Sequence, residues 1–259
     1  MIAQSGRAWF EKAGTADADA FTLNGYGCAA KTGGEALLRA LVQDIRRKIA
    51  PVEGLRLLEV GCGSGAMTSR LAAGTIHPVA IDFSHSMLVH ARRTTSHAFA
   101  AGDASRLPFP SRSFDRVVCY SVFNNFPSLL FAETVVDELI RVVRPGGNVL
   151  IGQVPNAARS DAWQRAYAAK FGQAPPSRLR ARAGAVKNRG LQIMRATLSL
   201  AGKRPPARLH FQYYTAEFFA RLAAQRSVKC ELLPAYNLLA EENSPDVLAD
   251  YRLDVKLTC

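Results

Sequence analysis

The stretch LLEVGCGSG, residues 57–65, decides the fold that we expect for this chain. Apolar residues surround one acid, Glu59, and glycine then recurs as Gly61, Gly63 and Gly65. A buried strand that enters a glycine-rich turn exposes backbone N–H groups to a ligand, because glycine has no Cβ. The spacing is GxGxG, whereas the dinucleotide fingerprint is GxGxxG, so a plain tight turn is the alternative.

Strand and helix patterns alternate around this stretch. The helices predicted from apolar spacing are 33–49, 64–74 with Ser64 at its start, 84–93 with Ser84 as N-cap, and 131–143. The predicted strands are 55–61, 77–82, 97–103, 114–122 and 148–154. Such alternation indicates an α/β domain, a parallel sheet with helices on both faces.

Composition excludes several classes of protein. The chain has 259 residues and is 48% hydrophobic, enough for one large core. Its five cysteines are scattered without a CxxC pair, so we expect neither a disulfide framework nor a metal site. The N-terminus has no apolar run typical of a signal peptide, and no apolar stretch reaches the ~18 residues of a membrane span. We therefore expect a cytoplasmic protein without a transmembrane segment.

The positive charge is concentrated in one segment. The chain carries a net +12, and residues 154–210 hold twelve Lys or Arg against a single acid, Asp161. A segment so poor in acids favours an anionic partner, although solvated helices also carry charged faces.

Acids also end the next two predicted strands. Asp82 is placed to accept hydrogen bonds from both hydroxyls of a ribose, and Phe83 follows as a flat apolar side chain. Asp103 can accept from an exocyclic amine, and Ala104 leaves its N–H free. The structural alternatives are a helix-capping role for Asp82 and a turn-forming role for Asp103.

Together these segments resemble the class I S-adenosylmethionine-dependent methyltransferases, in the small-molecule branch (methyltransferase type 11, ubiquinone-biosynthesis-like). The motifs that carry the resemblance are LEVGCGSG, AIDFSHSML, AGDASRLPFPSRSFDRVVCYSVF and ELIRVVRPGGNVLI, within about residues 55–155. The family implies a Rossmann-like, seven-stranded, mostly parallel sheet with an antiparallel last strand, plus a helical cap insertion. Residues 227–235 and 251–258 suit the terminal strand pair.

The resemblance also implies S-adenosyl-L-methionine as cofactor and assigns residues to it by position. Glu59 takes the amino group, and Gly61, Cys62, Gly63 and Gly65 form a backbone cradle. Asp82 takes the ribose, Phe83 and Met87 the apolar edge, Asp103 and Ala104 the adenine, and Ser121 lies beside the sulfonium. For Cys62 the simpler explanation is a small apolar residue that fits the turn.

Candidates for substrate binding are few. Asn124 and Asn125 follow the fourth predicted strand, where they can orient an acceptor but cannot take a proton. His210 is a weak candidate for catalysis, and Tyr213 and Tyr214 are candidates for substrate binding; an aromatic hinge that packs on the core is the alternative for this group. The other four histidines, His77, His85, His90 and His97, fit surface or packing positions.

The expected organisation has four parts. Residues 1–50 form a helical segment over the active site, 51–154 the cofactor-binding core, 155–210 a basic helical cap, and 211–259 the last helix and strand pair. The expected function is methyl transfer to a small anionic acceptor, sugar-derived, lipid-linked or a secondary metabolite, on oxygen. The alternative is an RNA methyltransferase whose basic cap binds phosphates. A cofactor-binding regulator without activity is the third possibility, disfavoured by the three acids at strand ends. The oligomeric state does not follow from the sequence.

Overall fold

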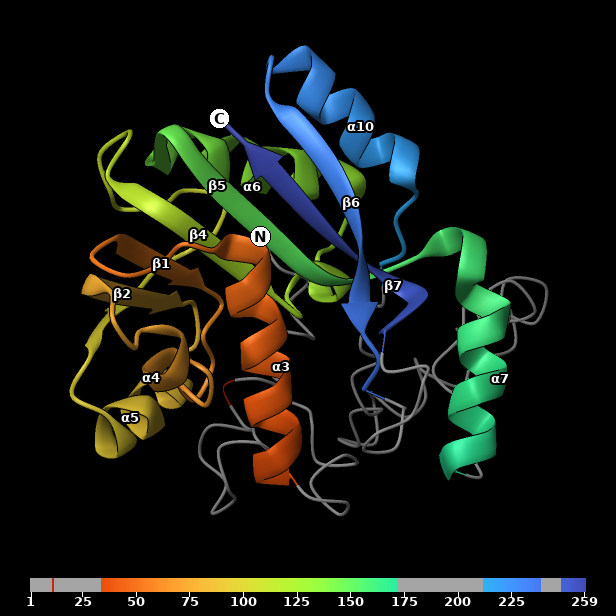
Figure 1. The fold of residues 1–259 in the computed structure, drawn as a ribbon, viewed down its shortest axis with the longest axis horizontal. Coiled ribbons are helices and arrows are strands. Elements are labelled where there is room, and N and C mark those ends of the chain that lie inside the picture. Colours follow the sequence, from red (N-terminus) through yellow and green to blue (C-terminus); the bar gives the residue numbers. More distant parts are fainter. Residues whose placement is uncertain (1–10, 12–33, 172–211, 239–247) are drawn as a thin grey trace, which may run out of the picture.

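A seven-stranded sheet forms the centre of the molecule (Figure 1). The computed structural model describes residues 11, 34–171, 212–238 and 248–259. The strands are β1 (Arg56–Val60), β2 (Ile76–Asp82), β3 (Ala98–Ala101), β4 (Phe114–Tyr120), β5 (Val143–Pro155), β6 (Lys229–Tyr236) and β7 (Leu248–Thr258). Their order is β3-β2-β1-β4-β5-β7-β6, and β7 is antiparallel to both of its neighbours. The predicted fold class is confirmed, including the antiparallel last strand.

Helices connect and cover the strands. They are α3 (Gly34–Ile49), α4 (Thr68–Leu71), α5 (His85–Thr94), α6 (Leu129–Val142), α7 (Ser160–Phe171) and α10 (Ala216–Gln225), with 3-10 turns η2 (Phe123–Asn125) and η3 (Ala157–Arg159). Side-chain oxygens of Ser84, Ser128 and Thr215 cap α5, α6 and α10 by accepting a backbone N–H three residues on. None of the described helices is long and apolar enough to cross a bilayer.

The helix predicted over residues 64–74 is wrong for most of its length. Only Thr68–Leu71 is α-helical, and its N-cap is Met67, which makes no side-chain capping bond. The glycine turn occupies the preceding residues, since the Gly65 N–H donates to Cys62 O and the Thr68 N–H to Gly65 O. Ser64 lies inside this turn and therefore does not begin a helix.

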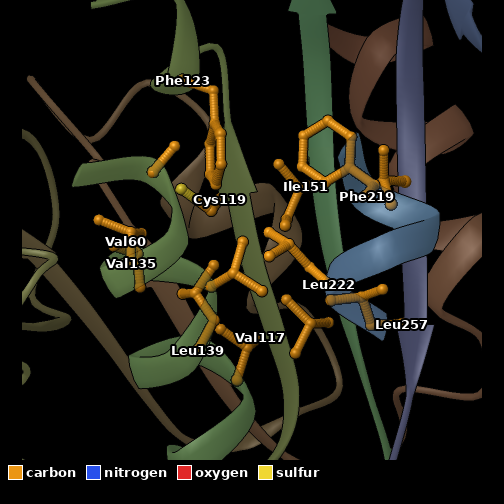
Figure 2. Packing of buried hydrophobic residues seen from close by; sticks show 14 of the residues in the cluster. Val60, Val117, Cys119, Phe123, Val135, Leu139, Ile151, Phe219, Leu222 and Leu257 are labelled. Atoms are coloured by element: carbon orange, nitrogen blue, oxygen red, sulfur yellow. The ribbon is translucent and has the colours of Figure 1, made fainter. Parts of the chain in front are cut away.

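Helices cover both faces of the sheet. Alternating residues of β4 divide between them, with Val117 and Cys119 in the cluster formed with α6 and α10, and Val118 and Tyr120 in the cluster formed with α3 and α4. Figure 2 shows the first cluster, in which side chains of α6 and α10 meet those of β4, β5 and β7. The core is thus three layers, helix, sheet and helix.

The carboxyl ends of the parallel strands align at one edge of the sheet. The Gly61 N–H donates to Ile81 O at 2.7 Å, Gly102 N–H to Asp82 O at 3.0 Å, and Ser121 N–H to Gly152 O at 3.0 Å. β2 and β3 lie on one side of β1, and β4 and β5 lie on the other, so the order of the strands reverses between β1 and β4 and the residues after these two strands border a topological switch point. Ligands of open α/β sheets bind at such a point.

Candidate functional site

The glycine turn after β1 has left-handed backbone at Gly61, Gly63 and Gly65, with φ of 79°, 55° and 75°. A Cβ on Gly61 would lie 2.3 Å from Val122 Cγ2, so this position requires glycine for packing of the turn against the segment after β4. The tight-turn alternative is therefore correct for Gly61 in structural terms. The space beside Gly61 is filled by Val122, and the cradle assigned to the turn stays a prediction.

Glu59 is a buried carboxyl without a donor. It is 2% exposed, and neither Oε1 nor Oε2 has a hydrogen-bond partner among the described residues. Burial raises the pKa of Glu59 to about 7; the nearby charge of Asp82 acts in the same direction and the Thr68 hydroxyl opposes it. A buried acid that lacks a partner at the end of a strand fits a site for a cationic group.

Asp82 fastens the turn to β2. Its Oδ2 accepts from the Gly63 N–H at 2.8 Å and its Oδ1 from the Ser84 N–H at 2.9 Å. The side chain is 7% exposed, and burial raises its pKa, while the two N–H donors oppose the increase. The bond to Ser84 supports the helix-capping alternative. Each carboxylate oxygen keeps a second lone pair, so the assignment to a ribose stays a prediction.

Asp103 forms a turn of its own. Its Oδ1 accepts from both the N–H and the hydroxyl of Ser105, at 2.9 and 2.7 Å, as the turn-forming alternative predicts. A Glu138–Arg141 pair on α6 fixes the loop that follows: Glu138 accepts from Leu107 N–H at 2.7 Å, and Arg141 donates to Leu107 O at 3.0 Å. This pair was missed in the sequence, where only its i, i+3 spacing on a helix marks it.

The remaining predicted cofactor residues divide by burial. Met87 and Cys62 are buried, whereas Phe83 and Ala104 are half-buried at the edge of the sheet. Burial raises the pKa of the Cys62 thiol, with the charges of Glu59 and Asp82 acting in the same direction, so Cys62 stays neutral and fits its packing role. Ser121 follows β4 with a left-handed φ of 60°.

The structure brings the predicted substrate residues together from distant parts of the chain. The Gln212 N–H donates to Asn124 O at 2.9 Å, which places the segment before α10 beside η2. Asn124 Nδ2 donates to Asn125 Oδ1 at 3.0 Å. Tyr214 is 1% exposed and its hydroxyl donates to Phe123 O at 2.9 Å, which fits the packing alternative. Tyr213 is also buried.

His210, the weak catalytic candidate, and most of the predicted cap lie outside the described residues. The start of the predicted cap is described, and it contains α7 (Ser160–Phe171). Of the other histidines, His77 and His85 are exposed, and His90 and His97 are half-buried. No cluster of three potential metal ligands occurs in the part of the chain that the structure describes.

Glu11 makes a contact that no sequence pattern predicts. Its carboxylate accepts from the N–H groups of His85 and Ser86, at 3.2 and 3.3 Å, where α5 begins. Its charge also contributes to the raised pKa of Asp82, after burial. Glu11 is 74 residues from His85 in the chain, so no local pattern marks the contact.

Comparison with known proteins finds a family that matches the strands at this edge of the sheet. Residues 58–151, from β1 to β5, match the family described as "Methyltransferase domain". Over these residues the chain is similar to class I S-adenosylmethionine-dependent methyltransferases. The methyltransferase domain thus coincides with the strands whose ends meet at the glycine turn.

Relatives of this methyltransferase domain include enzymes of lipid and quinone chemistry by name. A demethylmenaquinone methyltransferase of Clavibacter sepedonicus is 38% identical over 109 residues, which are 40% of this chain and 43% of that protein. A fatty-acid O-methyltransferase of Mycolicibacterium smegmatis is 36% identical over 125 residues, 46% of this chain and 44% of the relative. The match thus spans less than half of either relative.

The fold of the domain recurs in solved structures. The N-methyltransferase NodS of Bradyrhizobium japonicum WM9, solved with S-adenosyl-L-homocysteine, aligns over 98% of both chains with a TM-score of 0.59 and 15% identity. At this identity the likeness concerns the fold alone.

Proposed function

We propose that the protein transfers a methyl group from S-adenosylmethionine to an oxygen of a small, lipid-linked or quinol-like acceptor. The observation that carries the proposal is Glu59, a buried carboxyl without a donor beside the glycine turn, at the switch point of the sheet and within the residues that match a methyltransferase domain. The names of the two relatives support an acceptor of apolar character.

The residues present fit the cofactor. Glu59 would hold its ammonium group, the turn at Gly63 would lie along its methionyl part, and Asp82 and Asp103 would accept from the ribose and adenine. When bound, the cofactor supplies a methyl group activated on a positively charged sulfur. The protein then has to orient the acceptor and exclude water.

The acceptor side favours a nucleophile that needs little help from a base. Three amide side chains lie close together after the end of β4: Asn124 and Asn125 in η2, and Gln212 in the segment before α10. Amides orient a hydroxyl or carboxylate but do not remove a proton. A carboxylate, or an aromatic hydroxyl that ionises readily, fits this environment better than an ordinary alcohol. Such an acceptor is also the anionic kind that the basic segment 154–210 favours.

An acceptor panel tests the proposal. Purified protein would be incubated with methyl-labelled S-adenosylmethionine and, separately, long-chain fatty acids, a prenylated quinol, an aliphatic alcohol of the same chain length and total RNA. We expect label in the fatty-acid or quinol arm as an ester or ether. Label in the alcohol or RNA arm alone would contradict the proposed acceptor class.

A further inference from the structure

Three side-chain oxygens next to the glycine turn lack a hydrogen-bond donor. They are Glu59 Oε1, Glu59 Oε2 and Thr68 Oγ1, and none has a partner among the described residues. Glu59 is 2% exposed and Thr68 is 3% exposed, so solvent does not compensate. Buried polar atoms without partners are rare in folded proteins because each one costs desolvation free energy. Three of them at one place therefore point to a ligand.

Thr68 lies beside Glu59, and its hydroxyl acts as a donor toward the carboxyl, although no hydrogen bond of good geometry joins the two side chains. The hydroxyl opposes the increase in the pKa of Glu59 that burial causes, so the two side chains are neighbours. The Thr68 backbone is fully used, since its N–H donates to Gly65 O and its C=O accepts from the Ala72 N–H. The side chain has no part in this hydrogen bonding. Threonine at this position is thus unexplained by the local structure.

The chemistry of the three oxygens selects the ligand group. Two of them belong to a carboxyl and one to a hydroxyl, so the site accepts hydrogen bonds and favours positive charge. An ammonium group has three N–H donors and one positive charge, which matches the set. A carboxylate would be repelled by Glu59 and Asp82, and a neutral hydroxyl would satisfy only one of the three oxygens.

We propose that Thr68 is a cofactor-binding residue and that its hydroxyl, with both oxygens of Glu59, binds the ammonium group of the cofactor. The inference rests on the proposed function, since it concerns the same cofactor. It adds Thr68, which lies three residues beyond the last glycine of the turn.

A proton should leave the site when the cofactor binds. The free carboxyl has a pKa of about 7, whereas the ammonium pairs with the ionised form. The ionisable groups that face Glu59 are Asp82, Cys62 and Cys119, and the two thiols stay neutral because burial raises their pKa values. Affinity for the cofactor should therefore rise with pH as Glu59 ionises, by about tenfold from pH 5.5 to 7, where an α-amino group stays charged.

The test is calorimetric titration of S-adenosylhomocysteine into wild type, Thr68→Val and Thr68→Ser at pH 5.5 and pH 7. Thr68→Val keeps the shape and removes the hydroxyl, so we expect about tenfold weaker binding at pH 7 and a pH dependence moved to higher pH. Thr68→Ser should bind as wild type does. Methylthioadenosine, which lacks the ammonium group, should bind all three proteins equally.

Thermal unfolding separates a binding role from a structural one. Thr68→Val removes a buried hydroxyl that has no partner, so the free protein should unfold at the same temperature as wild type or higher. A lower unfolding temperature with unchanged affinity would overturn the inference, as would equal affinity and equal pH dependence in wild type and Thr68→Val. In either case wild-type binding would leave the proposed function intact, whereas failure of wild type to bind would contradict that function itself.

Discussion

At the scale of single residues, the buried carboxyl of Glu59 lowers the stability of the free protein and fits a binding site for a cationic group. Its pKa of about 7 in the folded protein exceeds the value of 4.5 expected when it is exposed. The free energy of unfolding is therefore unaffected by Glu59 ionisation below pH 4.5, where the carboxyl is protonated in both states. It falls as the pH rises from 4.5 through 7, because the folded state holds the proton more tightly than the unfolded state. At pH 8 the cost is about 3 kcal/mol, since one pKa unit is about 1.4 kcal/mol. A carboxyl retained at this cost is more easily explained by ligand binding than by stability.

Glu59→Gln should therefore stabilise the free protein at alkaline pH. We expect an unfolding temperature a few degrees above that of wild type at pH 8 and little difference at pH 5, where Glu59 is protonated in the folded protein. Differential scanning calorimetry on both proteins at both pH values measures the effect. Burial also raises the pKa of Asp254, to about 6. Its titration changes the stability of wild type and variant by the same amount, so it cancels in the difference. An equal shift at both pH values would contradict the assigned titration.

Gly61 and Gly54 give a matched pair for the glycine turn. Both have a left-handed φ, of 79° and 69°, but a Cβ on Gly54 meets no atom within 4 Å. Alanine at either position should share the backbone cost, and Gly61→Ala should lose about 1–3 kcal/mol more through overlap with Val122. Urea unfolding of both variants measures the difference. Adding Val122→Ala to Gly61→Ala should recover part of the lost stability. Equal losses of stability in Gly61→Ala and Gly54→Ala would show that the contact with Val122 does not contribute.

At the scale of elements, a buried charge network joins α3 to the last two strands. Lys48 Nζ donates to Asp44 Oδ2 at 2.6 Å, to Asp254 Oδ2 at 2.7 Å and to Pro234 O at 2.7 Å. Asp254 is 0% exposed, and its other oxygen accepts from the Gln153 N–H at 2.8 Å. The network thus anchors α3 beside the irregularity in β5, where the pairing with β7 shifts.

Replacement of Lys48 should strongly lower the free energy of unfolding. Lys48→Met leaves two buried carboxylates without their cation, and removal of one partner from a buried ion pair costs about 3–5 kcal/mol. Arg47→Met, at an exposed neighbour on the same helix, is the control and should change stability little. Denaturant unfolding of both variants checks this expectation. A small effect of Lys48→Met would mean that solvent reaches the network.

The elements also show which features the sequence could predict. The five parallel strands and the helices α3, α5 and α6 follow from apolar spacing and caps such as Ser84, because these signals are local, whereas the last two strands follow from the family resemblance. The helix predicted over residues 64–74 is longer than α4 because the turn around Gly63 includes residues that carry a helical pattern. Lys48 and Asp254 are 206 residues apart, so their contact depends on the fold and no sequence pattern marks it. The lack of a partner for Glu59 likewise becomes visible only once its neighbours are placed.

At the scale of the whole molecule, the distribution of charge bears on the partner. Residues 154–210 carry a net charge of +11, and most of them lie outside the described residues. Binding to RNA through several phosphates would weaken steeply with salt, with a slope of about 0.7 per phosphate in log K against log salt. For a small acceptor we expect weak binding of bulk RNA and a shallow slope, measured by fluorescence titration between low and physiological salt. A steep slope that is lost in the triple variant Arg178→Ala, Arg180→Ala, Arg182→Ala would favour the RNA alternative.

The central claim is that the edge of the sheet at β1 and β2 binds S-adenosylmethionine through Glu59. Calorimetric titration of the cofactor into wild type, Glu59→Gln and the exposed control Glu231→Gln at pH 7 tests it most directly. We predict one cofactor per chain for wild type and the control. For Glu59→Gln we predict an affinity about ten- to a hundredfold lower, because a charge-assisted hydrogen bond is lost. Absence of binding to wild type, or equal affinity in all three proteins, would contradict the account.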